Sequence, residues 1–218
     1  MDIRWRLRRG AAATPTRPRG FLSLKADFSK PDSIPSLFAA VKDEFRASSS
    51  VVVYNAAGRT LPPVKESVLS TPAETVVSDL IVNTISPYVA AQQAVSGWAS
   101  LPNEAKKTFI YTGNILNVCA VPSPMMMTLG MGKSASAYWI GLADNLYSTQ
   151  GFRSFCADER YEDGALKGMA IDGDAHADFY AQLAAHEGNV PWHATFVEDE
   201  GYVGFKLRVE RRPSRHST

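Results

Sequence analysis

The sequence predicts an α/β domain with a doubly wound, mostly parallel sheet. The first observation is a pair of short apolar runs that each lead into a glycine, "VVVYNAAG" (51–58) and "KKTFIYTGN" (106–114). Strands buried on both faces of a parallel sheet have this continuous apolar composition. The second observation is that segments with apolar residues at helical spacing alternate with such runs. This alternation indicates βαβ units and therefore a parallel sheet.

The first half of the chain contributes two expected strands and two expected helices. "GFLSLKADFS" (20–29) alternates apolar and polar residues, which predicts a strand that ends near Asp27. Residues 51–58 form the next strand. A long helix is expected from residue 71, where Thr71 and Glu74 match a capping box and Pro72 occupies the first helical position. Between the strands, a helix is indicated by apolar residues at helical spacing, namely Ile34, Leu37, Phe38, Val41 and Phe45.

The second half continues the alternation of strands and helices. Residues 106–114 form a buried strand, and "GFRSFCA" (151–157) forms another. Residues 173–186 form a helix, and strand-like runs follow in 192–209. A helix over 132–148 is expected to place four apolar residues on one side: Ala135, Trp139, Leu142 and Leu146.

Composition restricts the class of protein. A chain of 218 residues is long enough for one domain with a full core. A formal net charge of +1 favours neither nucleic acid nor a membrane as partner. No apolar run approaches the roughly 20 residues of a membrane span. Cys119 and Cys156 lie in apolar contexts, which favours a reduced, cytoplasmic setting over secretion.

Both ends of the chain differ from the middle. The first twenty residues hold six arginines and one acidic residue. They are read as a basic, disordered tail at 1–19, and a mitochondrial targeting peptide is the alternative. The last residues, 209–218, are read as a second basic tail. The domain is therefore expected to span residues 20–208.

The segment "MMMTLGMGKSASAYW" (125–139) contains Gly-Lys-Ser, the end of a phosphate-binding loop. The full pattern requires a glycine five residues before Gly132, where the backbone curls around the phosphate. That position is Met127, so Lys133 needs a different explanation.

Small or polar residues follow each of the expected parallel strands. They are Asp27, Asn55–Gly58, Thr112–Asn114 and the segment after Ala157. The carboxyl ends of parallel strands meet at one edge of a sheet, and ligands bind there in this architecture. We therefore expect one shared site at that edge, although such residues also serve as simple turn formers.

Five segments together resemble the short-chain dehydrogenase/reductase family, in the family's order. They are "KADFS", "YNAAG", "VNTISPYVAAQQAV", "TFIYTG" and "GKSASAYWIGLADNLYSTQGFRSFCA", which together span about residues 20–160. The family binds NAD or NADP on a Rossmann-like sheet. The resemblance therefore implies an NAD(P)-dependent oxidoreductase that acts on a small carbonyl or alcohol substrate, possible homo-oligomers, and no metal.

The resemblance assigns roles to particular residues. Lys133 matches the active-site lysine, which contacts the nicotinamide ribose, and Thr112 lies at the position of the catalytic serine. Asn83 matches an asparagine whose main-chain carbonyl binds a water of a proton relay. The expected cofactor contacts on the adenine side are Asp27, Phe28, Asn55, Ala56, Ala57 and Gly58, in addition to Lys133.

Two of these roles can be weighed against simpler accounts. Pro87 has no N–H to give to the carbonyl of Asn83, four residues earlier, so that carbonyl is freed from the helix. A kink made by proline alone is the alternative explanation. Lys133 is either the family's lysine or a solvent-facing lysine in the first turn of a helix.

Three features depart from the family pattern. No T-G-x-x-x-G-x-G turn precedes residue 20, so the chain is expected to be N-terminally truncated and to lack the first βαβ segment. The family's tyrosine, four residues before the lysine, is replaced by Leu129, and Tyr138 lies about 140° around the helix from Lys133. The Pro-Gly after the sixth strand is replaced by "ADER" (157–160). A non-catalytic relative of the family is therefore the alternative function.

The remaining candidate is His176, which lies near Asp172 and Asp174. These residues have the composition of a metal site, but they open a helix, where aspartate is a common cap. No further ligand stands at metal-site spacing, so no metal is expected. The stretch 157–175 occupies the position of the family's variable substrate loop.

Overall fold

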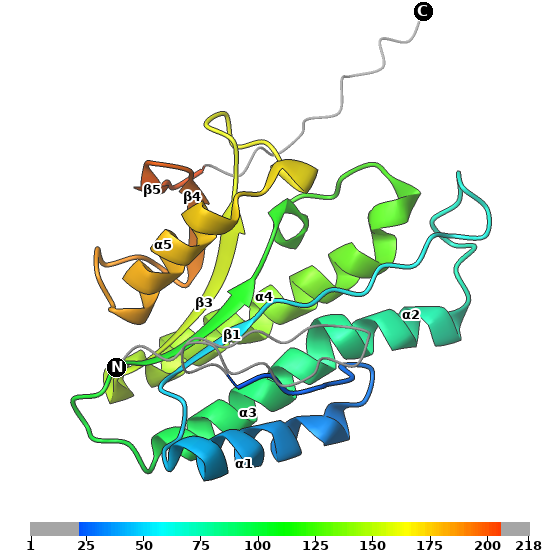
Figure 1. Cartoon of the computed structure of the whole chain (residues 1–218). Coiled ribbons are helices and arrows are strands. Elements are labelled where there is room, and N and C mark those ends of the chain that lie inside the picture. Colours follow the sequence, from blue (N-terminus) through cyan, green and yellow to red (C-terminus); the bar gives the residue numbers. More distant parts are fainter. Residues whose placement is uncertain (1–21, 206–218) are drawn as a thin grey trace, which may run out of the picture.

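The computed structural model describes residues 22–205, in which a five-stranded sheet forms the centre of the molecule (Figure 1). The strands are β1 (Val51–Tyr54), β2 (Lys107–Thr112), β3 (Phe152–Glu159), β4 (His193–Val197) and β5 (Gly201–Tyr202), and they stand in that order across the sheet. The first three junctions are parallel, and only β4 and β5 pair antiparallel. The predicted α/β fold with a mostly parallel sheet is therefore confirmed. The predicted tails at 1–19 and 209–218 lie outside the described residues.

Helices cover both faces of the sheet (Figure 1). One face packs against α1 (Ile34–Phe45), α3 (Ser86–Trp98) and α4 (Met127–Tyr147), and the other packs against α5 (Gly173–Ala184). In β2, Phe109 and Tyr111 belong to the first core and Ile110 belongs to the second. A strand with both faces buried needs apolar residues at every position, which explains the continuous apolar run. No helix in the described part of the chain is long and apolar enough to cross a membrane.

The long helix expected from residue 71 has an interruption. The first part is α2 (Ala73–Leu80), and a π-helical turn, Ile81–Ile85, joins it to α3. A π-helical turn forms where the regular bonding pattern is broken, and Pro87 cannot donate to the carbonyl of Asn83. The predicted capping box is wrong. Pro72 is the N-cap with an extended backbone, and its carbonyl accepts from the N–H groups of Thr75 and Val76.

The strand predicted at 20–29 does not form in the described part of that segment. Residues 22–27 have no regular structure, and no strand pairs with them. The alternation instead reflects packing on one side, because Leu24, Ala26 and Phe28 are half-buried while their neighbours at 25, 27 and 29 are exposed. The segment is held by a hydrogen bond of 2.7 Å from Ser86 Oγ to the carbonyl of Phe28. An extended segment that is buried on one side shows this alternation of apolar and polar residues even when no neighbouring strand pairs with it.

The face of α4 that packs inward also differs from the prediction. Ala135, Leu142 and Leu146 are exposed and Trp139 is only half-buried. The buried positions are instead Thr128, Gly132, Lys133, Ser136, Ala137, Ile140, Gly141 and Asp144. Small residues let the helix backbone approach its neighbours closely, so this narrow face packs inward and the bulkier face is exposed.

Gly132→Ala tests this close approach. A Cβ at residue 132 would lie 2.3 Å from the Cβ of Asn83, a side chain that hydrogen bonds fix in place. Overpacking of this kind costs about 1–3 kcal/mol, and we expect a loss of at least that size in the free energy of unfolding, measured by urea denaturation. Gly173→Ala is the control, because nothing lies within 4 Å of a Cβ there. Equal stability of the two variants would contradict the packing argument.

Candidate functional site

Lys133 lies at the centre of the carboxyl edge of the sheet, and it is buried. Its helix begins at Met127, so the residue stands in the second turn of α4 and not in a loop before a helix. The ammonium donates a hydrogen bond of 2.5 Å to the main-chain carbonyl of Thr112 and lies 4.4 Å from the centroid of the Tyr111 ring. Only 5% of the residue is exposed. Both the phosphate-binding loop and the solvent-facing lysine are therefore excluded.

Burial also changes the proton affinity of this lysine. Desolvation lowers the pKa of Lys133 from 10.5 to about 8, although Cys156 and Asp158 act in the opposite direction. A charged amine this deep in a protein is costly unless hydrogen bonds surround it. The carbonyl of Thr112 is the acceptor that the structure supplies.

Asn83 is the second buried polar residue of the site, and it joins three elements. Its freed main-chain carbonyl accepts hydrogen bonds from Tyr111 Oη (2.9 Å) and Ser136 Oγ (2.7 Å). Its side-chain amide exchanges two hydrogen bonds with the main chain of Gly58, at 2.8 Å from the N–H and 2.7 Å to the carbonyl. The residue has no exposed surface. The freed carbonyl predicted from Pro87 is thus present, with two protein hydroxyls as donors where the resemblance implies a water.

Thr112 and Lys133 meet only through the main chain. Successive side chains of a strand point to opposite faces, so Tyr111 faces α4 while Thr112 faces α5. Thr112 Oγ1 lies 2.8 Å from the hydroxyl of Tyr180 on α5. Burial raises the pKa of both tyrosines, so each remains a neutral phenol. The structure therefore separates the Thr112 hydroxyl from the Lys133 ammonium by the thickness of the sheet.

The residues expected on the adenine side divide into exposed and structural ones. Asn55 and Ala57 are exposed directly after β1, and Ala56 packs against the core. Gly58 is buried and bonded to Asn83. Phe28 makes an edge contact with Tyr54 at 5.3 Å between ring centroids. Asp27 is exposed, and its Oδ1 accepts from the N–H and hydroxyl of Ser29 at 3.0 and 2.6 Å.

These positions allow a test of whether the residues fit a nicotinamide dinucleotide. On the adenine side, Asn55 and Ala57 offer accessible surface at the carboxyl edge. On the nicotinamide side the fit is poor in this arrangement, because Lys133 is only 5% exposed and directs its ammonium at the Thr112 carbonyl. No glycine occurs between Phe21 and Ala57, so the described residues before β1 contain no glycine-rich turn for a pyrophosphate. Of the residues expected to hold such a cofactor, Asn55 and Ala57 are therefore accessible and Lys133 is not.

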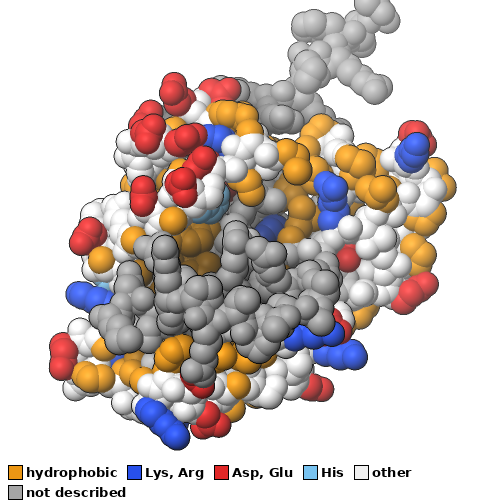
Figure 2. All heavy atoms as spheres, in the orientation of Figure 1, with side chains coloured by type: hydrophobic (Ala, Val, Ile, Leu, Met, Phe, Trp, Pro, Cys, Tyr) orange, Lys and Arg blue, Asp and Glu red, His pale blue; other side chains and the backbone are white. Residues whose placement is uncertain are grey.

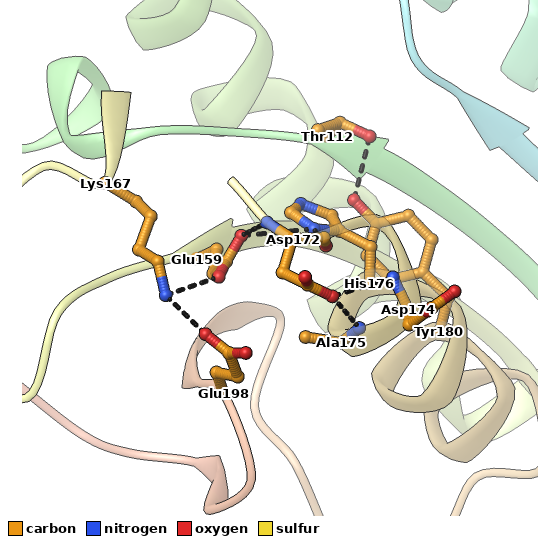
Figure 3. A network of polar contacts seen from close by, with 9 residues as sticks. All are labelled: Thr112, Glu159, Lys167, Asp172, Asp174, Ala175, His176, Tyr180 and Glu198. Atoms are coloured by element: carbon orange, nitrogen blue, oxygen red, sulfur yellow. Dashed lines mark hydrogen bonds and ion pairs between the residues drawn. The ribbon is translucent and has the colours of Figure 1, made fainter. Parts of the chain in front are cut away.

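A second polar network stands at the ends of β3 and β4 (Figure 3). Asp172 caps α5, since its Oδ1 accepts from the N–H groups of Asp174 and Ala175 at 2.8 Å each. His176 Nδ1 lies 2.6 Å from the carbonyl of Asp172 and 3.3 Å from Glu159 Oε2. Within residues 22–205 no three His, Cys, Asp or Glu side chains are placed to hold a metal ion. The expectation of an aspartate cap is confirmed.

Sequence reasoning missed several members of these networks, among them Tyr111, Tyr180 and Glu159. The alternation along β2 was the available signal for Tyr111, because it shares a face with Phe109. Tyr180 and Glu159 gave no signal of their own. Their partners come from other elements, and only the folded chain brings them together.

The comparison with known proteins identifies the family. No protein-family model matches the sequence. A curated protein of Cryptosporiopsis sp. (strain 8999), the short chain dehydrogenase/reductase dmxR12, is 39% identical over 202 residues. The match covers 88% of this chain and 81% of that protein. This chain belongs to the short-chain dehydrogenase/reductase family. The resemblance drawn from the five segments is thereby confirmed.

Solved structures of the same fold agree with this assignment. A metagenomic short-chain oxidoreductase in complex with NADP has a TM-score of 0.65 and 16% identity, over 81% of this chain and 73% of its own. A 4-hydroxyisoleucine dehydrogenase complexed with NADH and succinate has a TM-score of 0.65 and 15% identity, over 82% and 79%. A short chain dehydrogenase from Mycobacterium smegmatis has a TM-score of 0.64 and 14% identity, over 81% and 69%. At these identities the likeness supports the Rossmann-like fold alone.

Proposed function

We propose that this chain is an NAD(P)-dependent oxidoreductase that acts on a small carbonyl or alcohol compound. The observation that carries the proposal is the identity of 39% to a curated short chain dehydrogenase/reductase over most of both chains. Two solved structures of this fold that hold NADP or NADH support a nicotinamide cofactor, and either of the two is compatible with the residues here. Such a cofactor, when bound, supplies or accepts a hydride.

The roles of the chain's own residues follow from their positions. We assign Asp27, Phe28 and Asn55–Gly58 to the adenine side, where Asn55 and Ala57 are accessible. We assign Asn83 to the support of that loop through Gly58. Lys133 takes part in catalysis only if its buried ammonium becomes accessible to the cofactor, and Thr112 offers its hydroxyl from the opposite face.

The proposal extends to the setting of the protein. We place the domain at residues 20–208, between the basic ends 1–19 and 209–218. Both Cys119 and Cys156 are free thiols, which supports a reducing compartment such as the cytoplasm. The expected partners are a small-molecule substrate and a second copy of the chain, with neither nucleic acid nor membrane.

A non-catalytic relative is the second candidate function, and two observations favour it. Leu129 replaces the tyrosine that the family places four residues before its lysine, so no proton donor stands one helical turn from Lys133. Lys133 is also buried, with 5% of the residue exposed, so a cofactor has little access to its ammonium. Calorimetric titration with NADPH and NADH, followed by assays of NAD(P)H oxidation coupled to the reduction of a panel of aldehydes and ketones, separates the candidates. The enzyme binds and turns over, whereas the non-catalytic relative shows no turnover.

Leu129→Tyr is the variant that tests the register of the site. A phenol one helical turn before Lys133 has its pKa lowered by the ammonium, which makes it a better proton donor. General acid catalysis contributes roughly 10²–10⁴-fold, so we expect carbonyl reductase activity to rise on that order. Leu142→Tyr is the matched control, because Leu142 lies on the exposed face of the same helix. No change in either variant would show that the Lys133 ammonium does not serve the reaction.

A further inference from the structure

Buried charged side chains fix the segment between β3 and α5, residues 160–172, to the sheet. Glu159, the last residue of β3, is 3% exposed, and Lys167, in the middle of the segment, is 9% exposed. Charged groups rarely occupy such positions unless each has a partner of opposite charge. Their contacts therefore indicate what the pair holds in place.

The Glu159 carboxylate binds this segment at two points (Figure 3). Oε1 lies 3.0 Å from the ammonium of Lys167. Oε2 accepts a hydrogen bond of 2.8 Å from the N–H of Asp172, where the segment ends and α5 begins. The imidazole of His176, on the first turn of α5, approaches the same oxygen at 3.3 Å. One carboxylate at the end of a strand thus holds both the middle and the end of the loop.

Lys167 also makes an outer contact. Its ammonium lies 2.8 Å from Glu198, the residue after β4, whose side chain is 46% exposed. Hydrogen bonds to Glu198 and Glu159 raise the pKa of Lys167, so it stays charged. Figure 2 shows acidic side chains gathered over α5 and the β4–β5 turn, and Glu198 lines a groove of about 500 Å³ there. Lys167 therefore bridges a buried and a solvent-facing carboxylate.

The start of the segment is fixed separately. Arg160 pairs with the buried Asp158, and its Nη1 donates a hydrogen bond of 3.0 Å to the carbonyl of Gly164. The N–H of Tyr161 donates to the carbonyl of Ala165 at 3.1 Å, which closes a small hairpin. These contacts do not involve Glu159, so the hairpin keeps its own bonds when Glu159 is altered.

We infer that Glu159 is a positioning residue, whose buried carboxylate holds residues 166–172 against the ends of β3 and β4. The effect of Glu159 is confined to this segment and the start of α5, because the polar partners of its carboxylate are Lys167, Asp172 and His176. The consequence for substrate rests on the proposed function. The segment presents exposed apolar side chains at Met169 and Ile171, and fixing it fixes where those side chains meet a carbonyl compound.

Hydrogen exchange of the full chain, without cofactor or substrate, tests the inference. Glu159→Gln keeps the shape of the side chain and removes its charge. We expect the amides of residues 166–172 to exchange on the order of tenfold to a hundredfold faster, with β1, β2 and α4 unchanged. Lys167→Met should have the same local effect, and Lys167→Arg should restore slow exchange because it keeps the cation.

Glu198→Gln is the matched control, with the same chemical change on the solvent-facing partner. In this variant the amides of residues 166–172 should exchange at a rate within about twofold of the parent, since exposed ion pairs contribute little to stability. Three results would overturn the inference: no local change in Glu159→Gln, an equal increase throughout the chain, or an equal effect of Glu198→Gln. Turnover plays no part in this measurement, so a chain that fails to oxidise NADPH can still pass it.

Discussion

Asn83→Ala is expected to destabilise the folded chain by about 3–5 kcal/mol. Truncation removes the amide that bonds both the N–H and the carbonyl of Gly58. Each buried main-chain group left without a partner costs about 1–3 kcal/mol, and the lost side-chain volume adds a cavity. Gly58 is buried, so water cannot replace the amide without opening the structure. Urea denaturation followed by circular dichroism measures the loss as a lower midpoint with an unchanged slope.

Asn145→Ala is the matched control for this prediction. Asn145 is an exposed asparagine in the last turn of α4, so its loss should change stability by less than about 0.5 kcal/mol. A loss of under 1 kcal/mol in Asn83→Ala would contradict the assignment of Asn83 as the residue that joins the helical segment 73–98 to the end of β1. The expected loss is large enough to reduce the yield of folded protein, and a parallel thermal melt of the lysate would detect that.

The sequence predicted those features that follow from a single local pattern. The apolar run that became β2 identifies a doubly covered sheet, because Phe109, Ile110 and Tyr111 are buried on alternating faces. The same prediction is wrong for β1, where Val53 is 45% exposed. Pro87 predicted a freed carbonyl at Asn83, since a missing donor is a property of one residue and its spacing. The order of five family segments predicted the family that the curated relative confirms.

Features that depend on contacts between elements could not be read in this way. The inward face of α4 was predicted wrongly, because hydrophobicity favoured Leu142 and Leu146, whereas the close approach of the backbone at Gly132 and Gly141 decided the packing. The periodicity of a helix shows how apolar each of its faces is, but it does not show how closely a neighbouring element packs against that face. The irregular segment 22–27 shows the same limit, since half-burial without a paired neighbour gives the alternation of a strand.

Lys133 has one feature that a local pattern predicts and another that depends on contacts between elements. Its place four residues after Leu129 and at the edge of the sheet follows from the sequence. Its burial, and its bond to the Thr112 carbonyl, follow from how closely Gly132 brings α4 to the π-helical turn. The same close packing that makes the helix fit therefore removes the ammonium from the accessible surface. Whether the lysine stays there in solution decides between the two candidate functions.

The stability of the chain should rise between pH 8 and about pH 10.5, by about 3 kcal/mol, through Lys133 alone. Burial lowers the folded-state pKa of this amine to about 8, against 10.5 in the unfolded chain. Below pH 8 the amine is charged in both states, so the folded state carries the full cost of the buried charge. Between the two values only the unfolded chain keeps the proton, and the free energy of unfolding rises by about 1.4 kcal/mol per pH unit.

Lys133→Met isolates this contribution from every other group that titrates in the same range. Urea denaturation of parent and variant at pH 7, 8, 9 and 10 should give a difference in stability that moves in favour of the parent by about 3 kcal/mol as pH rises. Lys42→Met, at an exposed position of α1, should give a constant difference. A constant difference for Lys133→Met as well would mean that the ammonium is solvated at the sheet edge in solution. It would then be free to contact a nicotinamide ribose, and the oxidoreductase would be favoured over the non-catalytic relative.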